Sequence, residues 1–253
     1  MITAITRAPS ATMEGCELTF LAREPIDIER ARAQHAAYRA ALAAAGAEVV
    51  LLPALDGLPD SVFVEDTAIV LDSVAIMSTM GAESRRPETA AMAPVLRRYR
   101  TVQMLTAPAT LDGGDVMHVG NTLYVGQTAR TNRAAVEQLS ALLSRAGYRV
   151  IGVPLTKCLH LKSACTALGP HQVLINPEWV PASLFDAFSV LCVDPDEPFG
   201  ANAVSVGSAT IMPASAPRTR ERLVQAGLQP VAVDISEFEK AEAAATCLSI
   251  ILS

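Results

Sequence analysis

The sequence predicts an α/β fold in which one strand–strand–helix–strand unit is repeated five times around a closed ring. Three observations support this prediction. Five apolar runs each follow a predicted helix, and four short strand pairs each lie between one such run and the next helix. A fifth strand pair is completed only when the two ends of the chain are joined. We therefore treat residues 1–253 as a single domain.

Helical periodicity predicts five helices, in which apolar residues recur three and four positions apart. These helices cover residues 27–45, 88–98, 132–146, 182–188 and 219–226. The first and the third are the clearest, because Gly46 and Gly147 stand just beyond their ends, where glycine commonly stops a helix. The fourth is short.

Each predicted helix is followed by an apolar run that we interpret as a strand. The five runs are EVVLLP, TVQML, RVIGVP, VLCVD and PVAVDI. Continuous apolar runs of this length are typical of strands that are covered on both faces. We therefore expect all five to be buried on both sides.

The strand pairs are recognised by turn dipeptides inside apolar stretches. Four pairs read AIVLDSVAIM, DVMHVGNTLYVG, TALGPHQVLIN and AVSVGSATIMP, with Asp-Ser, Gly-Asn, Gly-Pro and Gly-Ser in the turns. The fifth pair is split between ITAITRA near the N-terminus and CLSIILS near the C-terminus. Pairing of these two segments would close the ring.

Polar residues occupy matching places in the connections that lead into the strand pairs. These connections read PDSVFVEDTA, LDGGDV, LHLKSA, DEPFGANA and AEAAATC. One residue from each forms a series with intervals of 42 to 48 residues: Asp66, Asp112, His160, Asn202 and Cys247. HEAT and propeller repeats have similar periods, but one helix and three strands per unit fit neither. Matching positions in a closed repeat should converge at one mouth of the ring, although Asn202 matches by spacing only.

The composition excludes several classes of function. Half of the residues are apolar (51%) and the net charge is −6, so we expect no nucleic-acid partner. We expect no signal peptide and no membrane span. The five scattered cysteines indicate free thiols in a reduced cytoplasmic setting. No zinc pattern and no phosphate-binding loop is present, so neither a cofactor nor a metal is expected.

The converging residues favour nucleophilic catalysis at an electron-poor carbon. A thiolate would attack, and an imidazole would move protons for the leaving group and then for water. Carboxylates beside a thiol would raise its pKa, unless the substrate itself is a cation. A guanidinium satisfies this condition, because carboxylates bind its planar N–H groups and its central carbon is the electrophile.

Six motifs in order resemble the dimethylarginine dimethylaminohydrolases, members of the guanidino-group-modifying (pentein) superfamily. The motifs are PDSVFVEDTAIV, SRRPE, LDGGDVMHVG, TARTN, LHLKSA and SEFEK…TC. The resemblance extends from near residue 18 to the C-terminus. It implies a five-bladed α/β propeller of ββαβ modules with pseudo-fivefold symmetry, in agreement with the repeat.

The resemblance implies three catalytic residues. Cys247 would be the nucleophile and His160 the general acid and base, and Asp112 would orient both His160 and the guanidinium. Some relatives have Glu in place of this Asp. The resemblance also implies a substrate-binding set, which consists of Leu18, Asp60, Glu65, Asp66, Arg85, Arg130 and Ala241.

Within this set, Glu65 and Asp66 would bind the guanidinium end of the substrate. Asp60 and the backbone of Leu18 would bind the α-amino group. The α-carboxylate would be held by two arginines, Arg85 and Arg130.

One departure from the family pattern lies near the C-terminus. Glu242-Ala243 stands where relatives often have Asp-Gly, so this wall of the site should differ in shape. The remaining histidines and cysteines are interpreted as structural: His35, His118, His171, Cys16, Cys158, Cys165 and Cys192.

The sequence thus predicts a metal-independent hydrolase that converts Nω-methylated arginine to citrulline and a methylamine. Its partner is this small molecule, and the protein is expected to be a monomer or homodimer. An arginine deiminase-like enzyme or an amidinotransferase would use the same core. A metallohydrolase remains an alternative, with ligands from Asp60, Asp66, Asp112 and His160. A non-catalytic binding protein of the same fold, such as translation initiation factor six, is the alternative from another class.

Overall fold

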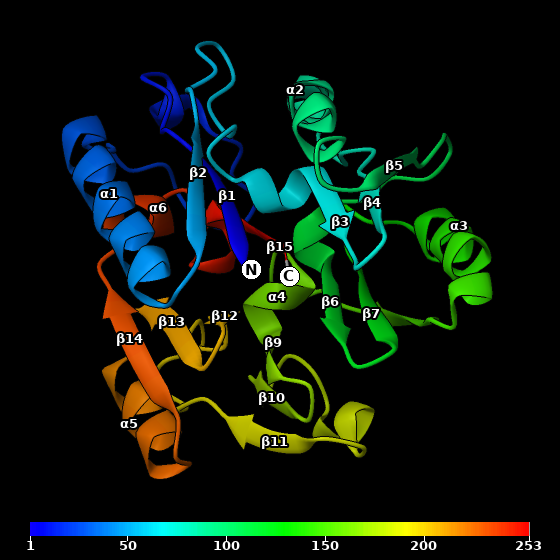
Figure 1. The fold of residues 1–253 in the computed structure, drawn as a ribbon. Coiled ribbons are helices and arrows are strands. Elements are labelled where there is room, and N and C mark those ends of the chain that lie inside the picture. The colour runs from blue at the N-terminus through cyan, green and yellow to red at the C-terminus, as the bar shows by residue number, and fades with distance from the viewer. Residues whose placement is uncertain (253) are drawn as a thin grey trace.

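The computed structural model, which describes residues 1–252, has the closed ring that the sequence predicts (Figure 1). Five three-stranded sheets surround a central axis, and the longer helices lie on the outer rim. Both ends of the described chain lie near the axis. The predicted α/β propeller of five ββαβ modules is therefore confirmed.

All five modules share one order, in which an antiparallel strand pair is followed by a helical crossover and a third strand parallel to the second. The first module consists of β15 (Ile250–Leu252), β1 (Thr3–Arg7), α1 (Ile28–Ala44) and β2 (Glu48–Leu52). The second consists of β3 (Ala68–Val70), β4 (Val74–Met77), α2 (Arg86–Leu96) and β5 (Thr101–Met104). The third consists of β6 (Val116–Val119), β7 (Thr122–Gln127), α3 (Arg133–Leu143) and β8 (Arg149–Pro154).

The last two modules follow the same order. The fourth consists of β9 (Cys165–Gly169), β10 (Gln172–Ile175), a 3₁₀ turn (Ala182–Phe185) and β11 (Ser189–Cys192). The fifth consists of β12 (Val204–Val206), β13 (Ala209–Pro213), α5 (Pro217–Gln225) and β14 (Gln229–Val233). Two short helices, α4 (Leu161–Ala164) and α6 (Ser236–Glu239), belong to connections between modules. Within residues 1–252, no helix has both the length and the apolarity that a bilayer crossing requires.

The first module joins the two ends of the chain. Strand β1 pairs in parallel with β2 and antiparallel with β15, so that Thr3 lies opposite Leu252 and Ile5 opposite Ile250. The predicted split strand pair is confirmed. Because β15 follows Cys247 directly, this pairing also fixes the segment that carries the expected nucleophile.

Capping residues set the ends of the two clearest helices. The Asp27 side chain accepts hydrogen bonds from the backbone N–H groups at the start of α1, and Asn132 does the same at the start of α3. Gly147, with φ of 82°, ends the helical segment after α3 in the left-handed conformation that glycine adopts without strain. Local sequence therefore decides these boundaries.

The expectation that the third strand of each module is buried on both faces is wrong. Strands β2, β5, β8, β11 and β14 each expose at least two of their residues. Each is the outer edge strand of its sheet, whereas the central strands β1, β4, β7, β10 and β13 are largely buried. The apolar runs at the edge thus pack against one rim helix rather than between two layers.

The fourth predicted helix is also corrected. Residues 182–188 form only a 3₁₀ turn over Ala182–Phe185, anchored by the fully buried Phe185. A segment this short forms too few backbone hydrogen bonds to offset the free-energy cost of helix nucleation. Its conformation is therefore decided by the tertiary packing of the Phe185 ring.

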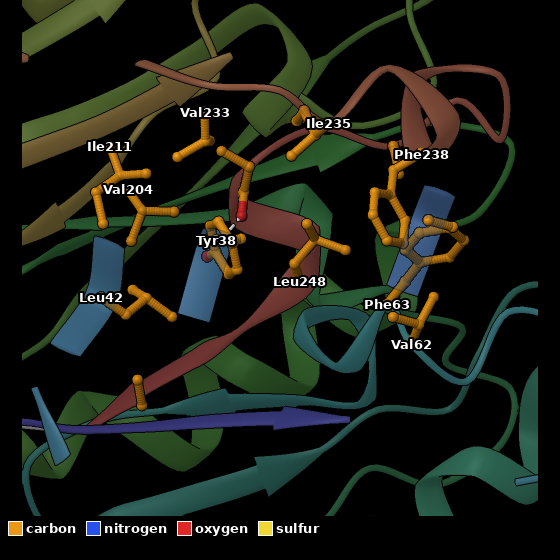
Figure 2. Close-up of a cluster of buried hydrophobic side chains, with 14 of the residues drawn as sticks. Tyr38, Leu42, Val62, Phe63, Val204, Ile211, Val233, Ile235, Phe238 and Leu248 are labelled. Atoms are coloured by element: carbon orange, nitrogen blue, oxygen red, sulfur yellow. Dashed lines mark hydrogen bonds between the residues drawn. The ribbon is translucent and has the colours of Figure 1, made fainter. Parts of the chain in front are cut away.

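The largest apolar cluster lies where the first and fifth modules meet (Figure 2). Tyr38 and Leu42 of α1 face Ile211 and Val233 of the fifth module, and Leu248 of the C-terminal segment lies on the other side of Tyr38, toward Phe63 and Phe238. The buried Tyr38 hydroxyl donates to the backbone oxygen of Ala245 at 2.8 Å and lies 2.7 Å from Ser249 Oγ. This rim helix therefore holds both sides of the turn that contains Cys247.

Tyr38→Phe should lower the free energy of unfolding by about 1–3 kcal/mol, because the Ala245 oxygen and the Ser249 hydroxyl lose a buried partner. Chemical denaturation measures this change. Tyr148→Phe is the matched control, since Tyr148 is only partly buried and its hydroxyl makes no hydrogen bond within residues 1–252. Equal stability of the two variants would contradict the anchoring role of Tyr38.

Candidate active site

Seven of the predicted site residues line one cavity at the mouth of the ring. They are Asp60, Asp66, Arg85, Arg130, His160, Ala241 and Cys247. Three predicted residues do not line its wall: Leu18, Glu65 and Asp112. The connections of different modules therefore converge as the repeat predicts, but not every residue faces the cavity.

Cys247 lies in a 3₁₀ turn (Thr246–Leu248) just before β15. The backbone N–H of Ala244 donates to its sulfur at 3.5 Å. Burial raises the pKa of the Cys247 thiol, and the carboxylates of Glu65 and Asp66 raise it further. The sulfur is therefore protonated when the cavity holds no cation, and a positive charge beside it would favour the thiolate.

Asn202 holds the residue before the cysteine. The Thr246 N–H donates to Asn202 Oδ1 at 2.8 Å, and Asn202 Nδ2 donates back to Thr246 Oγ1 at 3.0 Å. The Thr246 hydroxyl in turn donates to Glu65 Oε2 at 2.6 Å. Asn202, which the sequence marked by spacing alone, thus positions Cys247 through Thr246 and does not line this cavity.

His160 stands at the start of α4 between two carboxylates. Its Nε2 lies 3.2 Å from Asp112 Oδ2, and its Nδ1 lies 3.8 Å from Asp66 Oδ1. Burial lowers the pKa of His160, but Asp66, Asp112 and Asp115 outweigh burial and raise that pKa to about 9. The ring is therefore protonated at neutral pH and can donate a proton to a leaving group.

The glycines of LDGGD allow this close approach. The backbone N–H of Gly114 donates to Asp66 Oδ1 at 2.9 Å. A Cβ at this position would lie 2.7 Å from both Asp66 Oδ1 and His160 Nδ1, which no side chain tolerates. A glycine is therefore required here by packing against the histidine rather than by a bulge.

Asp112 lies behind His160 and is fully buried. Its Oδ1 accepts from the Gly81 N–H at 2.8 Å, and its Oδ2 lies 3.8 Å from Arg130 Nη1 as well as near His160. This carboxylate can orient the imidazole from behind. It is in no position on the cavity wall to meet a substrate directly.

Glu65 forms a buried ion pair with Lys162, with 2.6 Å between Oε1 and Nζ. Burial raises the pKa of Glu65, whereas Lys162 opposes this shift. Both residues line a second cavity together with Thr246 and residues of β3, β6, β9 and β12. Glu65 therefore lies next to Thr246, the residue before Cys247, and faces this second cavity.

Asp66 and Arg85 form the most buried ion pair of the cavity wall, with 2.8 Å between Oδ2 and Nη1. Glu88 binds the same guanidinium through Nε at 3.1 Å and Nη2 at 3.0 Å. Burial raises the pKa of Glu88 to about 7, against the opposing effect of Arg85. Arg85 is thus committed to two carboxylates, a constraint that the sequence analysis missed although Glu88 is the last residue of SRRPE.

Asp60 and Arg130 contact a segment near the N-terminus. Both carboxylate oxygens of Asp60 accept from the Glu17 N–H, at 3.2 and 3.1 Å. Arg130 Nη2 donates to Thr19 Oγ1 at 3.2 Å. Leu18 lies between these two contacts and is half-buried.

Asp115, the second aspartate of LDGGD, was missed as a functional residue. It is fully buried, and it accepts from the backbone N–H of Leu161 at 2.9 Å and from Thr128 Oγ1 at 2.7 Å. Burial raises the pKa of Asp115 to about 6, although His160 and hydrogen bonds oppose the shift. Asp115 therefore fixes the first residue of α4 and, with it, the backbone of His160.

The site thus combines a thiol, a protonated imidazole and a carboxylate at one end with Asp60 and Arg130 at the other. Within residues 1–252, no group of three His, Cys, Asp or Glu side chains is arranged to hold a metal ion. The arrangement is suited to nucleophilic attack by sulfur on a cationic carbon, with proton transfer by His160.

Glu65→Gln should speed alkylation of Cys247 by iodoacetamide roughly threefold or more at a fixed, mildly alkaline pH, because loss of the negative charge lowers the thiol pKa. Lys162→Met should slow it, because Lys162 favours the thiolate. Mass spectrometry resolves the label site by site. Exposed Cys192 is the internal control and should react at one rate in all variants. Changes of the same sign in the two variants would contradict this electrostatic account.

Comparison with known proteins agrees with this geometry. The family model described as "N,N dimethylarginine dimethylhydrolase, eukaryotic" matches residues 15–185. The chain is 45% identical over 250 residues to the N(G),N(G)-dimethylarginine dimethylaminohydrolase of Streptomyces coelicolor, covering 98% of this chain and 95% of that protein. It is 35% identical over 249 residues to the enzyme of that name from Pseudomonas aeruginosa, covering 97% of each.

Solved structures give the same result. A mutant of the Pseudomonas aeruginosa enzyme complexed with citrulline superposes with a TM-score of 0.95, at 34% identity over all of both chains. The N-terminal domain of ArgZ, a cyanobacterial arginine dihydrolase, reaches a TM-score of 0.86 at 21% identity over 100% of this chain and 98% of that one, a likeness of fold alone. From the identity, the coverage and the shared fold, we conclude that the chain belongs to the dimethylarginine dimethylaminohydrolase family.

Proposed function

We propose that this protein hydrolyses free Nω-methylated arginine to citrulline and a methylamine. The observation that carries the proposal is that one cavity is lined by Cys247, His160 and Asp66 together with Asp60 and Arg130. The first three groups suit a guanidinium, and the last two suit the α-amino and α-carboxylate groups of an amino acid. The family relatives support the same reaction.

The guanidinium end explains how a buried thiol becomes a nucleophile. Asp66 would accept from the guanidinium N–H groups, and the positive charge of the substrate would offset the carboxylates that raise the Cys247 pKa. The thiol proton passes to solvent as the cation binds, and the sulfur forms a bond to the guanidinium carbon while one carbon–nitrogen π electron pair moves onto nitrogen. The result is a tetrahedral adduct that still carries the methylamine group.

Two proton transfers by His160 would complete the reaction. The protonated imidazole donates to the departing methylamine, the carbon–nitrogen bond breaks, and a covalent thiouronium on Cys247 remains. Neutral His160 then takes a proton from water, whose oxygen bonds to the same carbon. The carbon–sulfur bond breaks, and citrulline and the thiol are released. Asp112 would keep the ring oriented through both transfers.

At the amino-acid end, Arg130 would be the main partner of the α-carboxylate. Arg85 already binds Asp66 and Glu88, so its remaining contribution is one N–H group and a largely neutralised charge. Asp60 and the Leu18 backbone would bind the α-amino group, and Ala241 would form part of the wall. Glu65, which does not line the cavity, would act on the substrate guanidinium through its negative charge.

The remaining expectations belong to the same proposal. Residues 1–253 would act as one catalytic domain, without nucleic acid or cofactor, as a monomer or homodimer in the cytoplasm. The net charge of −6 and the five cysteines support this setting. Light scattering coupled to size-exclusion chromatography measures the oligomeric state.

Incubation with dimethylarginine should yield citrulline and dimethylamine in equal amounts, as measured by mass spectrometry. Cys247→Ser should abolish turnover while the protein stays folded, because a hydroxyl at this position does not ionise and the volume is nearly unchanged. His160→Gln should reduce kcat by about 10²–10⁴-fold, since both proton transfers need the imidazole. If the substitution slows hydrolysis of the covalent intermediate more than its formation, a mass adduct will accumulate on Cys247.

An assay of unmethylated arginine beside dimethylarginine distinguishes the proposed enzyme from a deiminase, which would release ammonia from arginine at a comparable rate. Full activity that persists after exhaustive chelation removes the metallohydrolase alternative. Substantial turnover by a well-folded Cys247→Ser variant would refute the covalent route.

Methylarginine capped by N-acetyl and C-amide groups should not be turned over, whereas the free amino acid should. The caps remove both charges, so Asp60 and Arg130 would each lose the charge-assisted bond to the substrate, at roughly 1.5–3 kcal/mol for each lost bond. The loss in kcat/KM should be about 10²–10⁴-fold. Arg130→Ala should weaken binding of the free substrate and leave the low rate on the capped form nearly unchanged. Comparable kcat/KM for both forms would instead point to arginine within a protein chain.

A further inference from the structure

Residues 17–21, called the strap here, cover the amino-acid end of the cavity. The strap contains neither helix nor strand, and four of its five residues are exposed. Its Glu17 N–H is bound by Asp60, and its Thr19 hydroxyl accepts from Arg130. The strap therefore contacts the two groups proposed to bind the α-amino and α-carboxylate ends of the substrate.

A third anchor of the strap is Glu242. Its carboxylate accepts from three consecutive backbone N–H groups, those of Thr19, Phe20 and Leu21, at 2.5 to 3.0 Å. Successive N–H groups that converge on one anion form a compact anion-binding arrangement. Unlike Asp60 and Arg130, Glu242 has no role in the proposed reaction.

The backbone of Glu242 is unusual. Among residues 1–252 it is the only residue other than glycine with a positive φ, at 57°. A non-glycine residue in the left-handed region costs free energy, which a glycine at this position would avoid. The free energy that this backbone conformation costs is offset in part by the hydrogen bonds that the Glu242 carboxylate accepts from the strap.

Glu242 also separates two cavities. It lines the active-site cavity together with Asp60 and Arg130, and it lines a neighbouring, more apolar cavity with Phe20 and Leu21 of the strap. The Glu242 carboxylate can thus hold the strap at the opening of the active-site cavity without contacting the reacting atoms of the substrate.

We propose that Glu242 is a positioning residue that holds the strap over the amino-acid end and thereby selects free amino acids over arginine within a chain. The identity of the substrate rests on the proposed function, whereas the contact between Glu242 and the strap does not. With the strap in place, Asp60 and Arg130 are enclosed together with the α-amino and α-carboxylate groups. A peptide bond at either group would have to pass through the strap.

Hydrogen–deuterium exchange of the strap tests the contact without any substrate. Glu242→Gly removes the carboxylate and suits the positive φ, so the fold should keep or gain thermal stability while the amides of residues 19–21 exchange faster. Glu242→Gln keeps one acceptor oxygen and should give an intermediate rate. Glu239→Gln is the matched control, because Glu239 lies three residues earlier and contacts Ser215 instead of the strap.

Kinetics test the selectivity. For Glu242→Gly, KM for free methylarginine should rise roughly tenfold, while kcat changes by less than about threefold, because Cys247 and His160 are untouched. The rate on capped methylarginine should not fall, so the ratio of kcat/KM for free and capped substrate should narrow. Glu242→Gln should restore part of the KM.

Unchanged exchange in Glu242→Gly would overturn the proposal, and so would an equal effect of Glu239→Gln. A fall in kcat with KM unchanged would also overturn it, since that result would assign Glu242 to the chemistry. If the unmutated protein fails to turn over methylarginine, the proposed function is wrong, and faster exchange in Glu242→Gly would still establish the anchor.

Discussion

The pairing of β1 with β15 is the constraint on which the rest of the structure depends. Four modules are continuous in the chain, but the first is built from both ends, and its central strand is β1. The pairing closes the ring, and closure brings the connections of the modules to one axis. It also sets the turn that carries Cys247, which Tyr38 holds from the rim and Asn202 holds through Thr246. Fold and site therefore form together.

The second requirement is electrical. The axis gathers three carboxylates from two connections, and each has a cationic neighbour: Lys162 for Glu65, Arg85 for Asp66 and His160 for Asp112. Removal of water makes an unpaired charge costly, so these pairs are needed for the ring to close at all. The same pairs hold the thiol neutral and the imidazole charged until a cation enters. The same ion pairs thus neutralise the buried charges and set the protonation states of the thiol and the imidazole.

The sequence predicted the repeat, the strand pairs and the ring, because period and turn chemistry are local signals. It also marked seven of the residues that line the cavity, through spacing and family motifs together. It wrongly predicted that the third strand of each module is buried on both faces, since an apolar run does not reveal whether it forms the edge of its sheet. It missed Glu88, Asp115 and Lys162, because each acts through a partner from a distant connection or an adjacent turn. Spacing did detect Asn202, but only the fold shows that it acts on Thr246.

Ring closure has a consequence for how the protein is made. Because chains are synthesised from the N-terminus, β1 emerges early, yet one of its two partners, β15, emerges at the opposite end of the sequence. The contact of greatest separation along the chain is therefore also the last that can form. The turn with Cys247 gains its strand only at that moment. A growing chain can therefore assemble four modules before the segment that carries Cys247 is fixed in place.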